Sequence, residues 1–153
     1  MLFVASKNPE DKMDGEYIKE LTNEEKIVFI KIFCRMIKAD GNIDTEEVKF
    51  LKEIAKHFGV GGDAVVNIIK IANNIDCVAE ARKITDRKHA LQLIKELCVL
   101  SNIDEDLHDN ELDIIVDCAD AMGIEEEKVI LINRWVLDSQ IVAQTGKIIL
   151  EED

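Results

Sequence analysis

The chain has 153 residues, of which 47% are hydrophobic, and it contains one proline and seven glycines. This composition is typical of one compact, mostly helical domain and argues against a disordered chain. The net charge of −13 argues against nucleic acid and anionic lipid as partners, because both bind basic surfaces. No apolar run approaches the roughly 18 residues needed to cross a membrane, so we do not expect a membrane-inserted protein.

The N-terminus and the cysteines indicate a cytoplasmic protein. Residues 1–5 are apolar, but the segment is short and lacks the basic start of a signal peptide. The four cysteines form no Cys-x-x-Cys pair, and Cys34, Cys98 and Cys118 lie among apolar residues on helical patterns. We therefore expect these three to be reduced side chains packed in the core.

An apolar period close to 3.6 residues predicts helices along most of the chain, after a weakly patterned arm over residues 1–15. The predicted helices cover residues 16–21, 22–39, 46–58, 63–74, 77–83, 86–102, 111–122 and 125–142. We therefore predict an all-α fold, a single-domain bundle of about six to eight helices over residues 1–153.

Residues at the predicted helix ends support these boundaries. Thr22 begins a Thr-Asn-Glu-Glu segment of capping-box form, and Thr85 and Asp63 stand where two further helices need N-caps. Gly59 and Gly123 each follow a predicted helix, as expected for a left-handed residue that ends it.

We expect the last helix to stop before Gly146, leaving residues 147–153 as a frayed end or a strand-like tail. In the second case, residues 148–150 would pair with residues 2–4 as strands. The side chains expected to face inward from this helix are Val129, Ile132, Trp135 and Val136.

The sequence matches itself at a shift of 64 residues without a gap, which predicts an internal pseudo-twofold duplication. Identical pairs include Lys31 with Lys95, Cys34 with Cys98, Asp40 with Asp104, Glu47 with Glu111, Ala55 with Ala119 and Gly59 with Gly123. Each copy reads helix, short acidic turn, helix. The first repeat covers about residues 22–75 and the second about 85–142, with both terminal arms outside. We expect the long apolar helices over 22–39 and 86–102 to pack together at the centre.

The turn of the first repeat, residues 38–47, reads Lys-Ala-Asp-Gly-Asn-Ile-Asp-Thr-Glu-Glu. It resembles the A-D-G-x-[IL]-x-x-x-E turn of the TerB-like family, named for tellurite-resistance proteins, and the likeness extends over roughly residues 22–142. The second turn, residues 103–111, keeps the aspartate, the apolar residue and the glutamate, but has Glu105 where the family usually has glycine. The resemblance implies an all-helical domain linked to metal or oxidant stress, with acidic clusters suspected of binding cations. A related helical domain precedes a J domain in some co-chaperones.

Asp40, Asp44 and Glu47 are the candidate cation ligands of the first turn. Their spacing matches the back half of an EF-hand loop, but Met36 and Lys38 occupy the places of the first and third ligands. Three carboxylates and one carbonyl fall short of the six to eight oxygens that Ca²⁺ prefers. We therefore favour a capping role for Asp44 and Glu47, with a cation as the alternative.

The second turn is richer in candidate ligands. Asp104, Asp106, His108, Asp109 and Glu111 lie within eight residues, and a bound cation would relieve the repulsion between their carboxylates. Oxygen ligands favour Mg²⁺, Ca²⁺ or Mn²⁺, whereas participation of His108 favours Mn²⁺ or Zn²⁺. A solvated acidic loop and a divalent-cation site both remain open for this turn.

Nearly all the excess charge lies in one block, because residues 96–127 hold twelve Asp or Glu and no Lys or Arg. Within it, one helical face carries Asp109, Asp113, Asp117 and Asp120, where the first repeat has Thr45, Lys49, Glu53 and Lys56. Since the first repeat has one acid and two bases at these positions, helix packing does not require the four aspartates. We interpret this face as a docking surface for a basic protein, against the alternative of a merely soluble surface.

These patterns favour an interaction module over an enzyme. The sequence contains no P-loop, dinucleotide-binding fingerprint, G-x-S-x-G or H-E-x-x-H motif, and we expect His57 and His89 on the surface. The leading hypothesis is a cytoplasmic TerB-like interaction domain that docks a basic protein and has a divalent cation as an open option. The alternatives are a dedicated divalent-ion-binding or ion-sensing module and a ligand-free domain that forms homo-oligomers.

Overall fold

The computed structural model describes residues 16–38, 43–103 and 109–151, and these segments contain helices and no strand. The α-helices are α2 (Asn23–Ile37), α3 (Thr45–His57), α4 (Gly62–Ile71), α5 (Cys77–Ala81), α6 (Arg87–Ile103), α7 (Asp109–Ala121) and α8 (Glu126–Leu150). The 3-10 turns η2 (Glu16–Glu20) and η4 (Ala72–Asn74) precede α2 and follow α4. The predicted all-α fold is confirmed.

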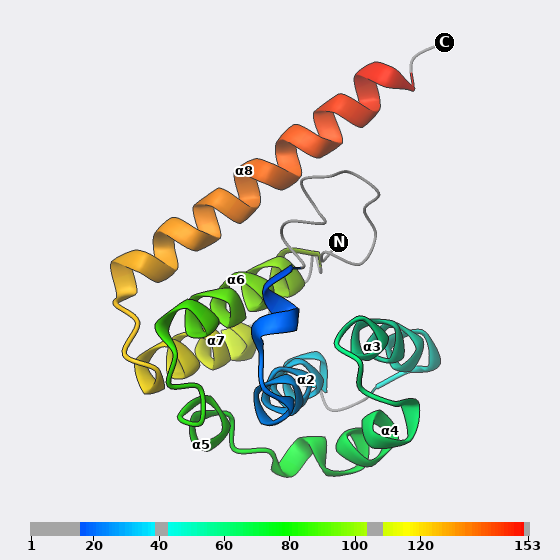
Figure 1. Cartoon of the computed structure of the whole chain (residues 1–153). Helices are drawn as coiled ribbons and strands as arrows, with labels where there is room; N and C mark the ends of the chain where they lie inside the picture. The colour runs from blue at the N-terminus through cyan, green and yellow to red at the C-terminus, as the bar shows by residue number, and fades with distance from the viewer. Residues whose placement is uncertain (1–15, 39–42, 104–108, 152–153) are drawn as a thin grey trace.

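The helices form two groups that α5 connects (Figure 1). In the first group α2 packs against α3 and α4, and in the second α6 packs against α7 and α8. Helix α5 contacts both α2 and α7, and α2 and α6 also touch each other, as expected. Cys34, Cys98 and Cys118 are buried free thiols, which confirms their expected place in the core.

Two predicted capping boxes are present. The Thr22 hydroxyl accepts the N–H of Glu25 at 3.1 Å, and the Glu25 carboxylate accepts the N–H of Thr22 at 2.8 Å. At the start of α3, Asp44 accepts the N–H of Glu47 at 2.8 Å, and Glu47 accepts the N–H of Asp44 at 3.3 Å. The predicted capping role of Asp44 and Glu47 is confirmed.

Two other predicted caps are wrong by one or two residues. Helix α6 begins at Arg87, so Asp86 rather than Thr85 accepts the N–H of His89 at 3.2 Å. This bond lowers the pKa of the Asp86 carboxyl. Helix α4 begins at Gly62, which places Asp63 inside the first turn, where its charge favours the positive end of the helix dipole instead.

Glycine ends α3 and α7 in the same way. Gly59 and Gly123 have φ of 75° and 73°, values that residues with a Cβ rarely adopt. Just beyond each glycine the chain turns back: the N–H of Val60 bonds the Ala55 carbonyl, and the N–H of Ile124 bonds the Ala119 carbonyl, both at 2.8 Å. Both predicted helix ends are confirmed.

The helix boundaries follow the register of the predicted duplication. Helices α6, α7 and α8 begin 64 residues after α2, α3 and α4 respectively, and α3 and α7 both have 13 residues. Glu25 and His89, which are also 64 residues apart, contact each other between α2 and α6. The spatial equivalence of the two repeats stays a prediction.

The end of the chain differs from the prediction. Helix α8 continues through Gly146 to Leu150, because a single glycine within a helix costs only about 1 kcal/mol relative to alanine. Residues 148–150 are therefore helical and not a strand, while residues 2–4 lie outside the described residues.

The burial of α8 also departs from the prediction at one position. Val136 is buried, and Val129 and Ile132 pack against the core, as expected. Trp135, which we expected in the core, is 52% exposed. Since Val136, the next residue, is buried, α8 still lies against the bundle at this point, and Trp135 lies on a neighbouring side of the helix that the described residues cover only in part.

Candidate functional site: an acidic groove between α7 and α8

Six of the eight predicted cation ligands lie outside the described residues or have side chains outside them. Asp40, Asp104, Asp106 and His108 are outside the described residues. Asp109 and Glu111 belong to α7, and their side chains are outside the description as well. Asp44 and Glu47 are brought together, but as the capping box of α3. Among the residues that the structure describes, no group of three His, Cys, Asp or Glu is placed to hold a metal ion.

The predicted docking face is well defined along most of α7. Asp113, Asp117 and Asp120 are all exposed, and their spacing of four and three residues puts them on one side of the helix. Helix α7 carries five acidic residues and no basic one. The exposed carboxylates therefore produce a negative potential along this side of the second helix group.

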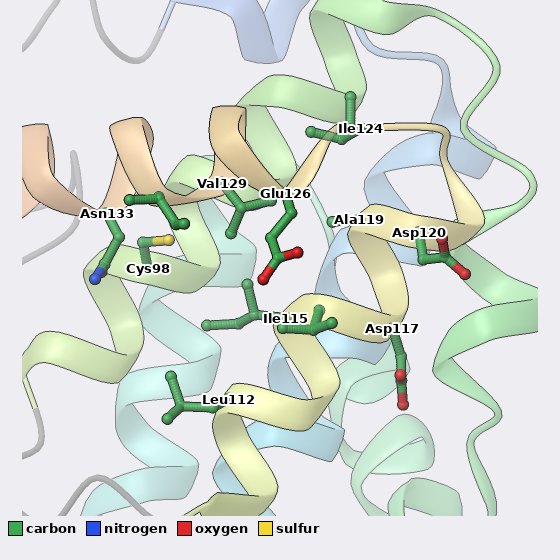
Figure 2. A pocket seen from close by; sticks show the side chains of 12 residues that line it. Cys98, Leu112, Ile115, Asp117, Ala119, Asp120, Ile124, Glu126, Val129 and Asn133 are labelled. Atoms are coloured by element: carbon green, nitrogen blue, oxygen red, sulfur yellow. The ribbon is translucent and has the colours of Figure 1, made fainter.

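A groove runs between α7 and the first half of α8, with a volume of about 410 Å³ (Figure 2). Its lining is mainly apolar: Leu112, Ile115, Val116 and Ala119 come from α7, Val129 and Ile130 from α8, Cys98 from α6, and Ile124 from the α7–α8 connection. Burial raises the pKa of the Cys98 thiol to about 12, so this sulfur stays protonated at neutral pH. The floor of the groove therefore behaves as an apolar surface.

Three acidic residues contribute to the lining of this groove. Glu126 points into the space between α7 and α8, whereas Asp117 and Asp120 project from the side of α7 farther from α8 (Figure 2). Asn133 lines the opposite end and accepts a hydrogen bond from the Asn102 side-chain amide at 2.9 Å. The groove thus combines an apolar floor with an acidic rim.

The apolar floor is open to solvent. Leu112, Val116 and Ile130 are 42%, 53% and 53% exposed. Three large apolar side chains grouped at one groove and bordered by charges are typical of a binding surface. The sequence carried a signal for it, because Val116 stands 64 residues after Lys52, an exposed position of the first repeat. The predicted docking face included the two aspartates of the rim but missed the groove.

A neighbouring ion pair fixes the start of α8. Arg87 donates to the Glu125 carboxylate at 2.7 Å and to the Gly123 carbonyl at 3.4 Å. The hydrogen bond from Arg87 is the main cause that lowers the pKa of Glu125. Because Glu125 immediately precedes α8, this pair ties the α7–α8 connection to the start of α6.

His89, which we expected on the surface, is mostly buried. Its Nδ1 lies 2.8 Å from the Glu25 carboxylate, and the two side chains are 12% and 11% exposed. The prediction failed because the contact joins two helices that are distant in sequence. This pair lies between α2 and α6, and neither residue lines the groove. We interpret it as a structural contact between the two helix groups.

Carboxylates around an apolar floor suit a ligand that is both cationic and apolar. The charges would attract Lys or Arg side chains, and the floor would accept Leu, Ile or Phe side chains between them. The described helices include none with the length and apolar character required to traverse a bilayer. The chain matches no family model, no curated protein and no solved structure.

Proposed function

We propose that the protein is an interaction module whose α7–α8 groove docks a basic, amphipathic segment of another protein. The observation that carries the proposal is the position of exposed Leu112, Val116 and Ile130 among the carboxylates of Asp117, Asp120 and Glu126. An amphipathic helix with basic residues beside its apolar stripe complements this surface in both charge and hydrophobicity. A cytoplasmic role in metal or oxidant stress is also proposed, supported by the likeness of the two acidic turns to the TerB-like family. Cation binding by those turns stays a prediction.

A synthetic amphipathic helix of leucine and lysine, labelled with a fluorophore, is a suitable probe. Fluorescence anisotropy should show that the Asp117→Lys/Asp120→Lys variant binds this peptide at least about tenfold more weakly than the unmodified protein, a loss of about 1.4 kcal/mol. The expected cause is that both substitutions turn attraction at the rim into repulsion. Val116→Lys should weaken binding similarly, because it places a charge on the apolar floor.

The first repeat supplies a matched control. Glu53 is an exposed acid on α3, 64 residues before Asp117. Glu53→Lys removes an acidic charge from the protein without touching the groove, so it should leave the dissociation constant nearly unchanged. If Glu53→Lys weakened peptide binding as much as the groove variants do, the binding would be due to the overall charge of the protein. That result would contradict the docking site.

A second candidate function, self-association, is favoured by the outer face of α8. Two rows of exposed apolar residues follow this helix at spacings of four and seven residues. One row holds Ile130, Leu137, Ile141 and Ile148, and the other holds Leu131, Trp135, Val142 and Ile149. In pairs of packed helices, the residues in contact recur at these spacings. An exposed apolar face of a helix is normally buried against another helix. We propose that a second copy of the chain covers it.

The charges of α8 fit a second copy. Residues 129–150 contain only Arg134, Asp138 and Lys147 as charged residues, so this face lacks the repulsion expected elsewhere between two chains of net charge −13. In an antiparallel pair with its twofold axis level with residue 136, Arg134 of each copy faces Asp138 of the other. In this pair, the C-terminal half of α8, after residue 136, would lie along the N-terminal half of α8 in the second copy.

Light scattering coupled to size-exclusion chromatography tests this pairing through a charge exchange. The unmodified protein should be a dimer at tens of micromolar, and Arg134→Glu or Asp138→Arg alone should raise the dissociation constant about tenfold or more by placing like charges opposite each other. The double variant should restore the dimer, and Lys147→Glu, on another side of the helix, should have little effect. A monomeric unmodified protein, or a double variant as weak as the single ones, would refute the arrangement.

A further inference from the structure

Two of the four cysteines lie against each other. Cys77 is the first residue of α5, and Cys118 lies in α7, which packs against α5. The Cys118 thiol donates a hydrogen bond to the Cys77 carbonyl oxygen, with 3.9 Å between the sulfur and the oxygen. Cys77 is 9% exposed and Cys118 is fully enclosed. Both are free thiols, and the Cys118 sulfur lies against Cys77 across the α5–α7 contact, with Cys77 at the edge of the solvent.

The contact shifts the pKa values of the two thiols in opposite directions. The hydrogen bond from Cys118 lowers the pKa of Cys77, and the positive charge of Arg35 lowers it further. Burial and the carboxylates of Asp76 and Glu80 act in the opposite direction but do not cancel the decrease. The same thiol–thiol hydrogen bond is the main cause that raises the pKa of Cys118. Cys77 is therefore the more acidic of the two thiols, and Cys118 is the less acidic.

The other two cysteines provide an internal comparison. Burial raises the pKa values of Cys34 and Cys98 to about 12, so their thiols remain protonated and unreactive. Because a thiolate is the reactive form of cysteine, Cys77 is the side chain on which oxidation should begin.

We propose that Cys77 and Cys118 are an oxidation site, at which hydrogen peroxide closes a disulfide bond between α5 and α7. The Cys77 thiolate attacks one peroxide oxygen, which breaks the O–O bond and leaves Cys77 as a sulfenic acid with release of hydroxide. This hydroxide takes up the proton that the Cys77 thiol lost on ionising and becomes the first water. The Cys118 sulfur then attacks the sulfenic sulfur. The S–S bond forms, the S–O bond breaks, and the departing hydroxide takes the Cys118 proton as a second water. Two thiols are oxidised and one peroxide is reduced to two waters.

The bond would have a structural consequence for the groove. Helix α7 supplies one wall of the groove, and α5 connects α7 to α2. A disulfide between α5 and α7 would restrain this wall against the first helix group and raise the melting temperature, because the cross-link restricts the unfolded chain.

The test uses the full chain, reduced and then treated with hydrogen peroxide. Alkylation of the remaining thiols under denaturing conditions, followed by mass spectrometry of proteolytic fragments, should find one linked pair of fragments carrying Cys77 and Cys118, with Cys34 and Cys98 alkylated. Loss of two hydrogen atoms from the intact mass should accompany a rise in melting temperature that a thiol reductant reverses.

Four serine variants separate this site from general cysteine oxidation. Cys77→Ser and Cys118→Ser should each abolish the linked fragments, whereas Cys34→Ser and Cys98→Ser should keep them. The mapping on unmodified protein stands even if a variant folds poorly. Linkage through Cys34 or Cys98, or over-oxidised Cys77 with Cys118 still free, would overturn the proposal.

Discussion

Phe33→Ala is expected to lower the free energy of unfolding by about 3–5 kcal/mol, and the melting temperature by about 6–20 °C for a domain of this length. Phe33 is fully buried in α2 and forms a triangle with Phe29 and Phe58, with ring centroids 5.8–6.2 Å apart. Truncation removes the ring from the apolar interior and leaves a cavity that two rigid rings fill poorly. Denaturant unfolding followed by circular dichroism measures the loss.

The predicted repeat offers a comparison for this result. Leu97 stands 64 residues after Phe33 and is fully buried in α6. Leu97→Ala should also destabilise the protein, by about 2–5 kcal/mol, whereas Lys52→Ala on the exposed side of α3 should change it by less than about 0.5 kcal/mol. A loss below about 1 kcal/mol for Phe33→Ala would mean that the aromatic triangle is not part of the core.

Lys95→Met should have an effect of similar size, about 3–5 kcal/mol. The Lys95 ammonium lies 2.6 Å from the Glu96 carboxylate, and the two side chains are 11% and 0% exposed. The same ammonium lies 5.7 Å from the centre of the Tyr17 ring. Removing this cation leaves a carboxylate in an apolar interior without its closest counter-charge, and a buried charge that loses its counter-ion is strongly destabilising.

Two further variants show whether the lost counter-charge is the cause. Glu96→Gln added to Lys95→Met should recover part of the stability, because the double variant no longer buries a net charge. Lys31, 64 residues before Lys95, pairs with Glu80 at 3.1 Å in a more exposed setting, so Lys31→Met should cost less. Equal losses for Lys31→Met and Lys95→Met, or no recovery in the double variant, would contradict this account.

Features set by a few neighbouring residues could be predicted from the sequence. The capping boxes at Thr22 and Asp44 and the left-handed Gly59 and Gly123 each depend on residues within one helical turn, and all are present. Errors at the starts of α4 and α6 have the same local origin, because adjacent residues compete for one capping position.

Features that join distant segments could not be predicted in this way. A pattern of apolar residues marks Trp135 as one to be covered, but only the positions of the other helices show that it stays half exposed. The groove arises from Leu112 and Val116 on one helix facing Ile130 on another, and the Cys77–Cys118 contact from two helices brought together by packing. The 64-residue repeat predicted that α2 and α6 meet, but no pattern in the sequence indicated that α7 meets α5 and α8.

The unequal lengths of α4 and α8 have a mechanical consequence. Both begin at equivalent positions, but α4 ends at Ile71, where the chain must turn back toward α5. Helix α8 continues from Trp135 to Leu150, which at 1.5 Å per residue is about 22 Å. This rod acts as a lever arm: a tilt of a few degrees at its base displaces its tip by more than an ångström. Any contact that tilts the base of α8 would therefore be amplified at the far end of the rod.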